Sequence, residues 1–288
     1  MAGYKILDGA IGSELIRRGV DLPKHIWSAE ANVTNPDTVK RIHEEYVAAG
    51  ADYITTNTFR TTPRAYLKTG VDYEESAKMA KNSLLCGVKL ARDAAGSSVK
   101  VVGAIAPLED CYMPQLFTNQ ELAVEEFCQT AKWLSKAKVD ILLLETMNSM
   151  AETEAGLIAL QNFKHPIWVS FILKNDRHLL SGDPIDDVFE MMKLYSVDCI
   201  MFNCNPLDRT AMAVEKLVDR FSSKWGVYPN LGVGEPSPDG NITNYESMEK
   251  FISLIDRVLH LGASVGGACC GSSPEHIAAI NKMRHDSE

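Results

Sequence analysis

The feature that most constrains this chain is the regular alternation of short apolar runs with longer helical patterns along its 288 residues. Runs rich in β-branched residues are typical of buried strands, and apolar residues three or four apart are typical of helices. Strands that alternate with helices pair in parallel, and eight such units close into a barrel. The sequence therefore predicts a (β/α)8 TIM barrel with strands at residues 4–8, 52–57, 101–105, 140–145, 167–173, 199–203, 227–231 and 263–268.

Signals at the predicted helix boundaries agree with this alternation. Asn35-Pro36 and the pair Thr118 and Glu121 are typical of helix starts, and Gly50 and Gly262 fall where helices should stop. A doubly wound open sheet is the alternative, but no Gly-x-Gly-x-x-Gly turn follows the first strand. No linker or shift in composition interrupts the pattern, so residues 1–288 are expected to form one domain.

Charge and hydropathy exclude several classes of partner. The formal net charge is −9 and no basic stripe is present, which argues against nucleic acid. No apolar run approaches the roughly 18–20 residues that span a bilayer, so no membrane association is expected. The N-terminal residues lack the apolar core of a signal peptide, and a cytoplasmic location is expected.

Seven cysteines are present, and the odd count in a chain without a signal peptide predicts reduced thiols. Cys204 follows the sixth predicted strand, and the adjacent pair Cys269 and Cys270 follows the eighth. Loops at the carboxyl ends of barrel strands share one face, so the three sulfurs could converge. Three thiolates leave one position open on a tetrahedral Zn²⁺, as in a catalytic site. The alternative, small buried side chains, is preferred for the remaining cysteines, Cys86, Cys111, Cys128 and Cys199.

Two carboxylates also lie at predicted strand ends. Glu145 closes the apolar run Ile141–Leu144, where an unpaired charge would be costly to bury. Asp8 closes the first strand before Gly9, a position where an aspartate is also common as a simple turn residue. Glu145 is therefore expected to have a partner, whereas Asp8 is either a turn residue or a functional one.

Four segments, taken together, resemble the homocysteine S-methyltransferase family. They are the segments Leu7–Leu15, Ala49–Phe59, Asn203–Pro206 and Gly267–Ile277, the last of which contains Gly267-Ala268-Cys269-Cys270-Gly271. The resemblance extends in order from about residue 4 to residue 284 and implies a (β/α)8 barrel. It also implies that Cys204, Cys269 and Cys270 bind zinc, that Asp8 and Glu145 hold the amino group of homocysteine, and that amides around Gly9 and Thr56 bind its carboxylate. Asn203 is included among the substrate-binding residues.

The chemistry of such a site is methyl transfer to a thiol. A free thiol has a pKa near 8.5, and its thiolate is the nucleophile. Coordination to zinc deprotonates an incoming thiol, which then attacks an activated methyl group. Together with the resemblance, this chemistry implies transfer of a methyl group to homocysteine, giving methionine.

The methyl donor is the less determined substrate. The stretch around Trp27 resembles S-methylmethionine-dependent members, and an indole could contact a sulfonium donor. Arg60 and Thr146 replace aromatic residues of the betaine-dependent branch, which disfavours betaine, and Arg60, with Arg64 beyond it, could bind an anionic group. S-methylmethionine is the first choice, while methylfolate, betaine and a different thiol acceptor stay open. The Gly/Pro-rich segment 231–240 is expected to shape a lid.

Two other classes of function are alternatives. A Schiff-base lyase would use Lys174, which follows the fifth predicted strand, and would not need zinc. A non-catalytic metal-binding barrel would leave Asp8 and Glu145 without a purpose. The oligomeric state is left open by the sequence.

Overall fold

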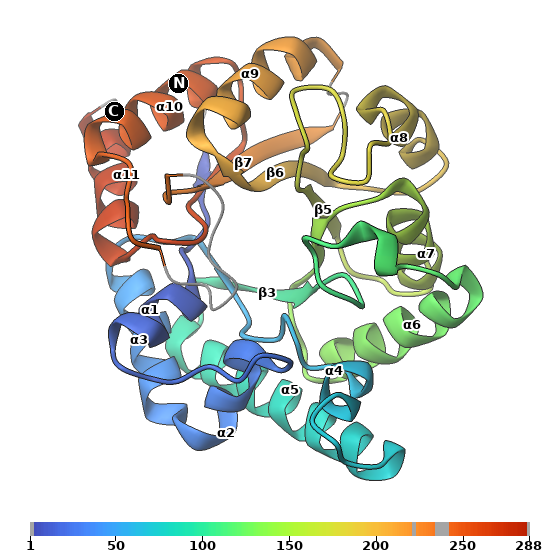
Figure 1. Cartoon of the computed structure of the whole chain (residues 1–288). Coiled ribbons are helices and arrows are strands. Elements are labelled where there is room, and N and C mark those ends of the chain that lie inside the picture. The colour runs from blue at the N-terminus through green and yellow to red at the C-terminus, as the bar shows by residue number, and fades with distance from the viewer. Residues whose placement is uncertain (1–2, 221–222, 234–241, 287–288) are drawn as a thin grey trace.

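The computed structural model describes residues 3–220, 223–233 and 242–286, so residues 234–240 of the expected lid lie outside the described residues. Eight parallel strands form one sheet in the order β1-β8-β7-β6-β5-β4-β3-β2, and helices surround it (Figure 1). The predicted (β/α)8 barrel is confirmed. Its strands are β1 Lys5–Ile6, β2 Tyr53–Thr55, β3 Lys100–Ile105, β4 Ile141–Met147, β5 Ile167–Phe171, β6 Cys199–Pro206, β7 Lys224–Asn230 and β8 Val265–Gly266.

The first and second strands close the barrel. Leu7 and Tyr53 form a parallel bridge, and the amide of Asp52 donates to the carbonyl of Ile6 at 2.8 Å. The amide of Asp8 donates to the carbonyl of Tyr53 at 3.0 Å. The sheet is therefore continuous around the barrel, and the carboxyl end of each strand opens on the same face.

Two strands extend beyond their predicted ends. β4 continues to Met147 and β6 to Pro206, and the register with the neighbouring strand shifts between Leu144 and Met147 and between Asn203 and Pro206. Such shifts mark β-bulges, which bend a strand and redirect its side chains. Glu145 and Cys204, which were predicted at and just after strand ends, both lie inside these irregular segments.

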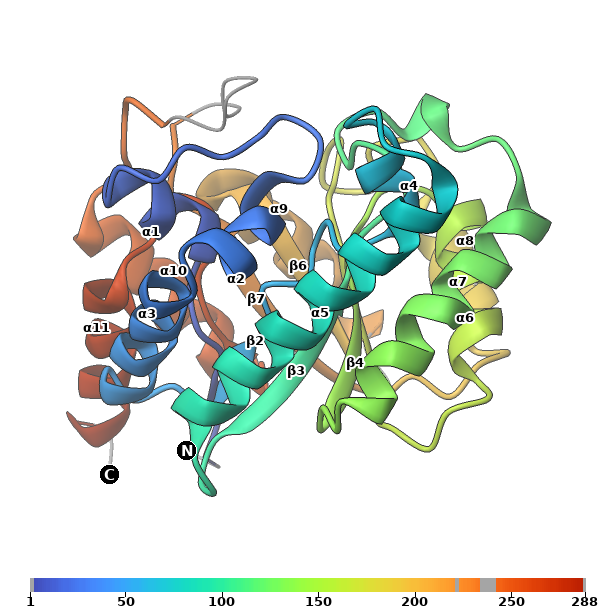
Figure 2. The ribbon, with the colours of Figure 1, turned by 90° about the horizontal axis from the view of Figure 1, so that it is seen from below.

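Helices cover the outside of the sheet (Figure 2). Gly50 and Gly262 adopt positive φ angles of 104° and 98° just after helices, as predicted for helix stops. The predicted start at Thr118 is one residue early, because the side chain of Asn119 accepts from the amide of Leu122. The helices are α1 Ile11–Arg17, α2 Ala31–Thr34, α3 Pro36–Ala48, α4 Pro63–Leu67, α5 Tyr73–Ala95, α6 Gln120–Lys136, α7 Met150–Leu160, α8 Ile185–Met192, α9 Leu207–Leu217, α10 Met248–His260 and α11 Pro274–Asp286, with 3-10 turns η1 Trp27–Glu30, η2 Pro114–Leu116 and η3 Val218–Arg220.

Three groups of buried side chains form the core, the smallest of which contains Ile26, Ala65, Tyr66 and Ala80. The largest group packs between the strands and the helices, and the second includes Leu7, Val102, Leu143, Met201 and Tyr228. This second group combines residues of several strands, as the filled interior of a barrel does. None of the helices in the described part of the chain has the length and apolarity needed to span a bilayer.

Candidate metal and substrate site

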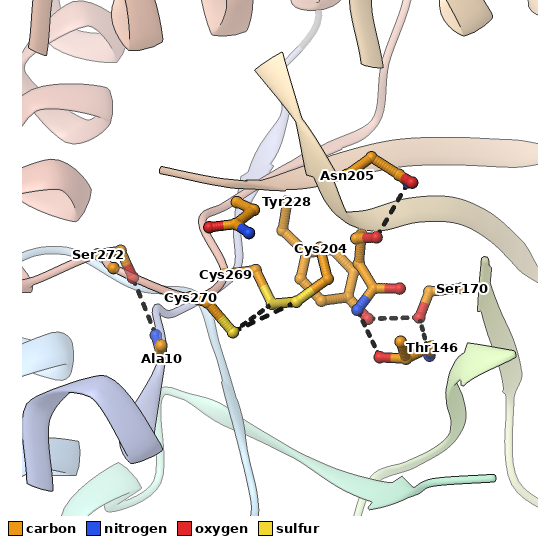
Figure 3. Close-up of a disulfide and its surroundings, with 12 residues drawn as sticks. Ala10, Thr146, Ser170, Cys204, Asn205, Tyr228, Cys269, Cys270 and Ser272 are labelled. Atoms are coloured by element: carbon orange, nitrogen blue, oxygen red, sulfur yellow. Dashed lines mark hydrogen bonds between the residues drawn. A yellow bond between two sulfur atoms is a disulfide. The ribbon is translucent and has the colours of Figure 1, made fainter. Parts of the chain in front are cut away.

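Three cysteine sulfurs converge at the carboxyl ends of β6 and β8 (Figure 3). The Sγ atoms of Cys204 and Cys270 are 3.4 Å apart, and those of Cys269 and Cys270 are 4.0 Å apart. All three sulfurs lie within 4.8 Å of one another. In a tetrahedral site with Zn–S bonds of about 2.3 Å, neighbouring sulfurs are about 3.8 Å apart. The cluster therefore offers the three sulfur donors of a thiolate metal site, and two of its three sulfur pairs are spaced as such a site requires.

Cys204 and Cys269 are joined as a disulfide, with their Cα atoms 5.5 Å apart. This corrects the prediction that all seven cysteines are reduced. The physical reason is proximity, since the fold brings the ends of β6 and β8 together and places these two cysteines side by side. A metal ion needs thiolates as ligands, so reduction of this disulfide has to precede metal binding.

The loop that carries the vicinal pair is fixed from two sides. The amide of Leu231 donates to the carbonyl of Cys270 at 2.9 Å, and the amide of Cys269 donates to the carbonyl of Pro229 at 2.8 Å. From α1, the hydroxyl of Ser13 accepts from the amide of Gly271 at 2.9 Å. Gly271 has a φ of +82°, which a glycine adopts without strain. These contacts hold both side chains of the pair at the barrel mouth.

Burial makes the free Cys270 thiol a weak acid. Burial, followed by the nearby Glu145 carboxylate, raises the pKa of Cys270 to about 11. At neutral pH and without a cation, this side chain is a neutral thiol. A bound cation would reverse that balance, because a coordinated thiol is deprotonated.

Asp8 lies at the end of β1 and is buried. Its carboxylate accepts from the amide of Thr55 at 2.9 Å and from the Thr55 hydroxyl at 3.0 Å. Burial raises the pKa of Asp8 well above its usual range, and Glu145 raises it further against the lowering effect of Thr55. No described residue forms an ion pair with Asp8, so its charge lacks a cationic partner.

Glu145 projects from the irregular part of β4 toward the same space. Burial raises its pKa to about 7, and a hydrogen bond from the Tyr228 hydroxyl lowers it in part. Within the described ranges Glu145 has no salt bridge either. Because Glu145 and Asp8 repel each other electrostatically, the site favours a cation between or beside them.

Thr56 and Gly9 differ in what their amides offer. The amide of Thr56 donates to the carbonyl of Val102 at 2.8 Å, and its hydroxyl lies 2.6 Å from that of Thr58. Both the amide and the hydroxyl of Thr56 are therefore already hydrogen-bonded within the barrel wall. The amide of Gly9 has no acceptor among the described residues, and an added Cβ there would lie 2.5 Å from the Ser272 hydroxyl.

Asn203 is buried directly before Cys204. Its Nδ2 donates to the hydroxyl of Thr146 at 2.7 Å, while its Oδ1 is buried without a partner in the described part of the chain. A buried unpaired acceptor costs about 1–3 kcal/mol, which makes a further donor favourable at this point.

The two residues expected to bind the methyl donor lie on different segments, Trp27 in the turn η1 and Arg60 after β2. The indole of Trp27 packs on α1, where a Cβ at Gly12 would lie 2.7 Å from its Nε1. The Arg60 guanidinium donates to the carbonyl of Glu109 at 2.6 Å and lies 5.4 Å from the Phe59 ring centre. Among the described residues Arg60 has no ion pair.

Arg64 is not available for an anionic substrate. It forms ion pairs with Glu109 at 2.9 Å and with Glu126 at 2.5 Å. These two carboxylates tie Arg64 to α6 and to the loop that follows β3. The hydrogen bond with Glu126 is the main cause that raises the pKa of Arg64 above its usual value, against the lowering effect of burial. The sequence shows the arginine but not its partners, because Glu126 is 62 residues away.

Lys174 lies on an exposed hairpin and not inside the barrel mouth. Its amide donates to the carbonyl of His178 at 3.0 Å, and Leu173 pairs with Leu179 in an antiparallel bridge. A Schiff-base lysine reacts from a desolvated pocket, so this position does not favour the lyase alternative.

Three site residues were not predicted as functional. The hydroxyls of Tyr228 and Ser170 are hydrogen-bonded at 2.6 Å, and the amide of Thr146 donates to the Ser170 hydroxyl at 3.0 Å. They occupy ordinary strand positions in the sequence. The one sequence signal that could have identified them is that each is a polar residue within an otherwise apolar strand.

Comparison with known proteins gives a consistent result. A family model described as homocysteine S-methyltransferase matches residues 5–284. The chain is 27% identical to the homocysteine S-methyltransferase of Escherichia coli K12, covering 96% of this chain and 93% of that one. It is also 27% identical to the selenocysteine Se-methyltransferase of Brassica oleracea var. italica, covering 97% and 88%.

Solved structures agree with the sequence relatives. The metallated form of the E. coli homocysteine methyltransferase MmuM superposes with a TM-score of 0.83 at 26% identity, covering 97% of this chain and 96% of that one. Its oxidised form gives a TM-score of 0.84 with the same identity and coverage. A dihydrodipicolinate synthase-family protein, YagE, shares the fold alone, at 10% identity and a TM-score of 0.56. The chain belongs to the homocysteine S-methyltransferase family of enzymes.

Proposed function

We propose that this enzyme transfers a methyl group from S-methylmethionine to the thiol of homocysteine, with Zn²⁺ held by Cys204, Cys269 and Cys270. The observation that carries the proposal is the placement of three convergent sulfurs beside two carboxylates, the buried Asp8 and the half-buried Glu145, that have no cationic partner among the described residues. An amino acid that carries a thiol supplies both missing groups, because its ammonium pairs with the carboxylates while its sulfur reaches the cysteines.

The substrate end of the site follows from the same contacts. Glu145 and Asp8 would hold the ammonium of homocysteine, and Oδ1 of Asn203 is a further acceptor for it. The free amide of Gly9 would donate to the carboxylate. Thr56 would act through the barrel wall, because its own amide is already bonded to Val102.

Zn²⁺, when bound, would lower the pKa of the substrate thiol so that the sulfur is a thiolate at neutral pH. The chain positions that sulfur in line with the donor methyl group. The new bond joins sulfur to the methyl carbon, the donor's C–S⁺ bond breaks, and its electron pair returns to the donor sulfur. With S-methylmethionine both products are methionine.

The donor assignment depends on Arg60 and Trp27. Arg60 carries guanidinium protons beyond the one bonded to Glu109, and they would bind the carboxylate of an amino-acid donor. The indole of Trp27 would face the sulfonium. A cation at position 60 and a threonine at position 146 disfavour betaine, whose quaternary ammonium needs aromatic neighbours.

The test is a methyl-transfer assay on reduced, Zn²⁺-loaded protein. Homocysteine is mixed separately with methyl-labelled S-methylmethionine, betaine and methylfolate, and labelled methionine is measured by mass spectrometry. We expect label only from S-methylmethionine, loss of product in C270S, and normal product in C128S, which removes a cysteine on α6. Label from betaine or methylfolate would correct the donor, and no label from any donor would overturn the proposed function.

The lyase alternative is tested in the same preparation. Reduction with borohydride traps a Schiff base on lysine, and the adduct is located by peptide mass spectrometry. We expect no adduct on Lys174 and an unchanged methyl-transfer rate in K174M. An adduct that K174M abolishes would support the lyase instead.

A further inference from the structure

The bulges in β4 and β6 share an uncommon backbone geometry. Thr146 has a φ of +61° and Cys204 a φ of +52°, although neither is glycine. For a β-branched residue such as threonine this left-handed conformation is strained, and it persists only where surrounding contacts hold it. Both strained residues belong to the proposed site. Thr146 directly follows Glu145, and Cys204 is itself a proposed metal ligand.

One hydroxyl group joins the two bulges. The Thr146 Oγ1 accepts from Nδ2 of Asn203 at 2.7 Å, across the intervening strand β5. The Thr146 amide donates to the hydroxyl of Ser170 on β5, which is also hydrogen-bonded to the hydroxyl of Tyr228 on β7. All four side chains are buried, with Thr146 at 3% exposure. Four neighbouring strands are thereby tied together directly beneath the site.

We propose that Thr146 is a positioning residue that fixes Cys204 for metal binding and, through the same hydroxyl, links the metal site to the substrate carboxylate Glu145. The inference rests on the proposed function, because it assigns a role toward that site's metal and substrate. Without the hydroxyl, Nδ2 of buried Asn203 loses its acceptor, and the residue before Cys204 is no longer anchored to β4. Partners of metal ligands typically change metal affinity by about 10–100-fold when removed.

Two substitutions separate the hydroxyl from the shape of the side chain. T146V keeps the β-branch and removes the acceptor, whereas T146S keeps the hydroxyl. Affinity for Zn²⁺ alone is measured on reduced protein by competition with a chromophoric chelator, which does not require turnover. We expect T146V to bind Zn²⁺ about 10–100-fold more weakly and T146S to stay within a few-fold of wild type.

The matched control is T153V on α7. Thr153 is also fully buried, and its hydroxyl donates to the carbonyl of Ser149 at 2.6 Å, away from the cysteines. We expect T153V to leave Zn²⁺ affinity unchanged. Wild-type affinity in T146V, an equal loss in T146S, or an equal loss in T153V would each overturn the positioning role. If T146V fails to fold, T146A removes the same hydroxyl without the added methyl group, and the same loss is expected.

The coupling to Glu145 has its own measurement. We expect T146V, saturated with Zn²⁺, to raise KM for homocysteine by at least several-fold while KM for the donor stays constant. An unchanged KM for homocysteine would overturn the link to Glu145. A wild-type chain that binds no Zn²⁺ would overturn both proposals. A chain that binds Zn²⁺ but transfers no methyl group would overturn the proposed function alone, since the Zn²⁺ affinities still decide the role of Thr146.

Discussion

At the scale of single residues, the site is defined by charges that the fold buries without neutralising them. Glu145 follows four apolar strand residues, and burial raises its pKa to about 7. Such a position costs stability, so it is expected where function requires it. A carboxylate with this pKa binds an ammonium group only in its ionised form, and it changes state close to neutral pH.

Homocysteine recognition should therefore depend on pH through Glu145. We expect kcat/KM for homocysteine to fall as pH drops from 8 to 6, because protonation of Glu145 removes its attraction for the substrate ammonium. E145Q should have a kcat/KM lower by at least tenfold at pH 8 and lose the part of the pH dependence that belongs to this carboxyl. The measurement is the ratio of wild type to E145Q across pH. A ratio that stays constant would contradict the role of Glu145.

Glu152 is a second buried carboxyl, outside the catalytic proposal. It accepts from the amide of Leu108 at 2.7 Å, and burial raises its pKa from its usual 4.5 to about 7. A raised folded-state pKa gives stability that is complete below pH 4.5 and lost as pH rises through 7, worth up to about 3 kcal/mol. E152Q should thus be more stable than wild type at pH 8 and equal to it at pH 4.5. Thermal unfolding at both pH values tests this.

The matched control is E125Q, an exposed glutamate of α6, which should differ little from wild type at either pH. A stability gain in E152Q that is the same at both pH values would contradict the ionisation account. That result would indicate instead that the glutamine side chain at position 152 packs better than the glutamate.

At the scale of elements, the neighbouring strands β7 and β8 approach each other too closely for a side chain at one position. Gly226 of β7 is in register with Val265 of β8, and a Cβ added at Gly226 would lie 2.8 Å from the Cβ of Val265 and still closer to its carbonyl oxygen. Backbone in a closed sheet cannot move away without breaking ladder hydrogen bonds. A side chain is therefore excluded at this position.

G226A should destabilise the protein by about 1–3 kcal/mol or more, as overpacking does. G266A is the matched control in β8, since its added Cβ would meet side-chain atoms only at 3.6 Å or beyond. Thermal unfolding of both variants gives the comparison. Equal stability of G226A and G266A would contradict the crowding argument.

The elements also show what the sequence could predict. Apolar runs marked all eight strands, because burial on both faces leaves a strong pattern. The bulges were not predicted, since the φ angles of Thr146 and Cys204 depend on contacts with Ser170 and Asn203 from other strands. For the same reason the sequence located the three cysteines but not the disulfide, and Arg64 but not its ion pairs.

At the scale of the whole molecule, the metal site links parts of the chain that are far apart. Cys204 lies on β6, and the vicinal pair lies in the loop that joins β8 to α11, 65 residues later. That loop is anchored on α1 by Ser13 and on the end of β7 by Leu231. A ligand held by these cysteines therefore connects the first and last units of the barrel with its sixth.

Metal binding should consequently stabilise the entire barrel, and only in the reduced protein. A ligand that binds the folded state alone adds about 2.7 kcal/mol at a concentration 100 times its Kd. We expect Zn²⁺ to raise the Tm of reduced wild type by several degrees, and a chelator to reverse the rise. In oxidised protein, where Cys204 and Cys269 are joined, one thiolate of the three remains and Zn²⁺ should leave the Tm unchanged. C128S should respond like wild type and C270S should not respond. An equal rise in oxidised and reduced protein would show that Zn²⁺ binds elsewhere, and the three-cysteine site would have to be abandoned.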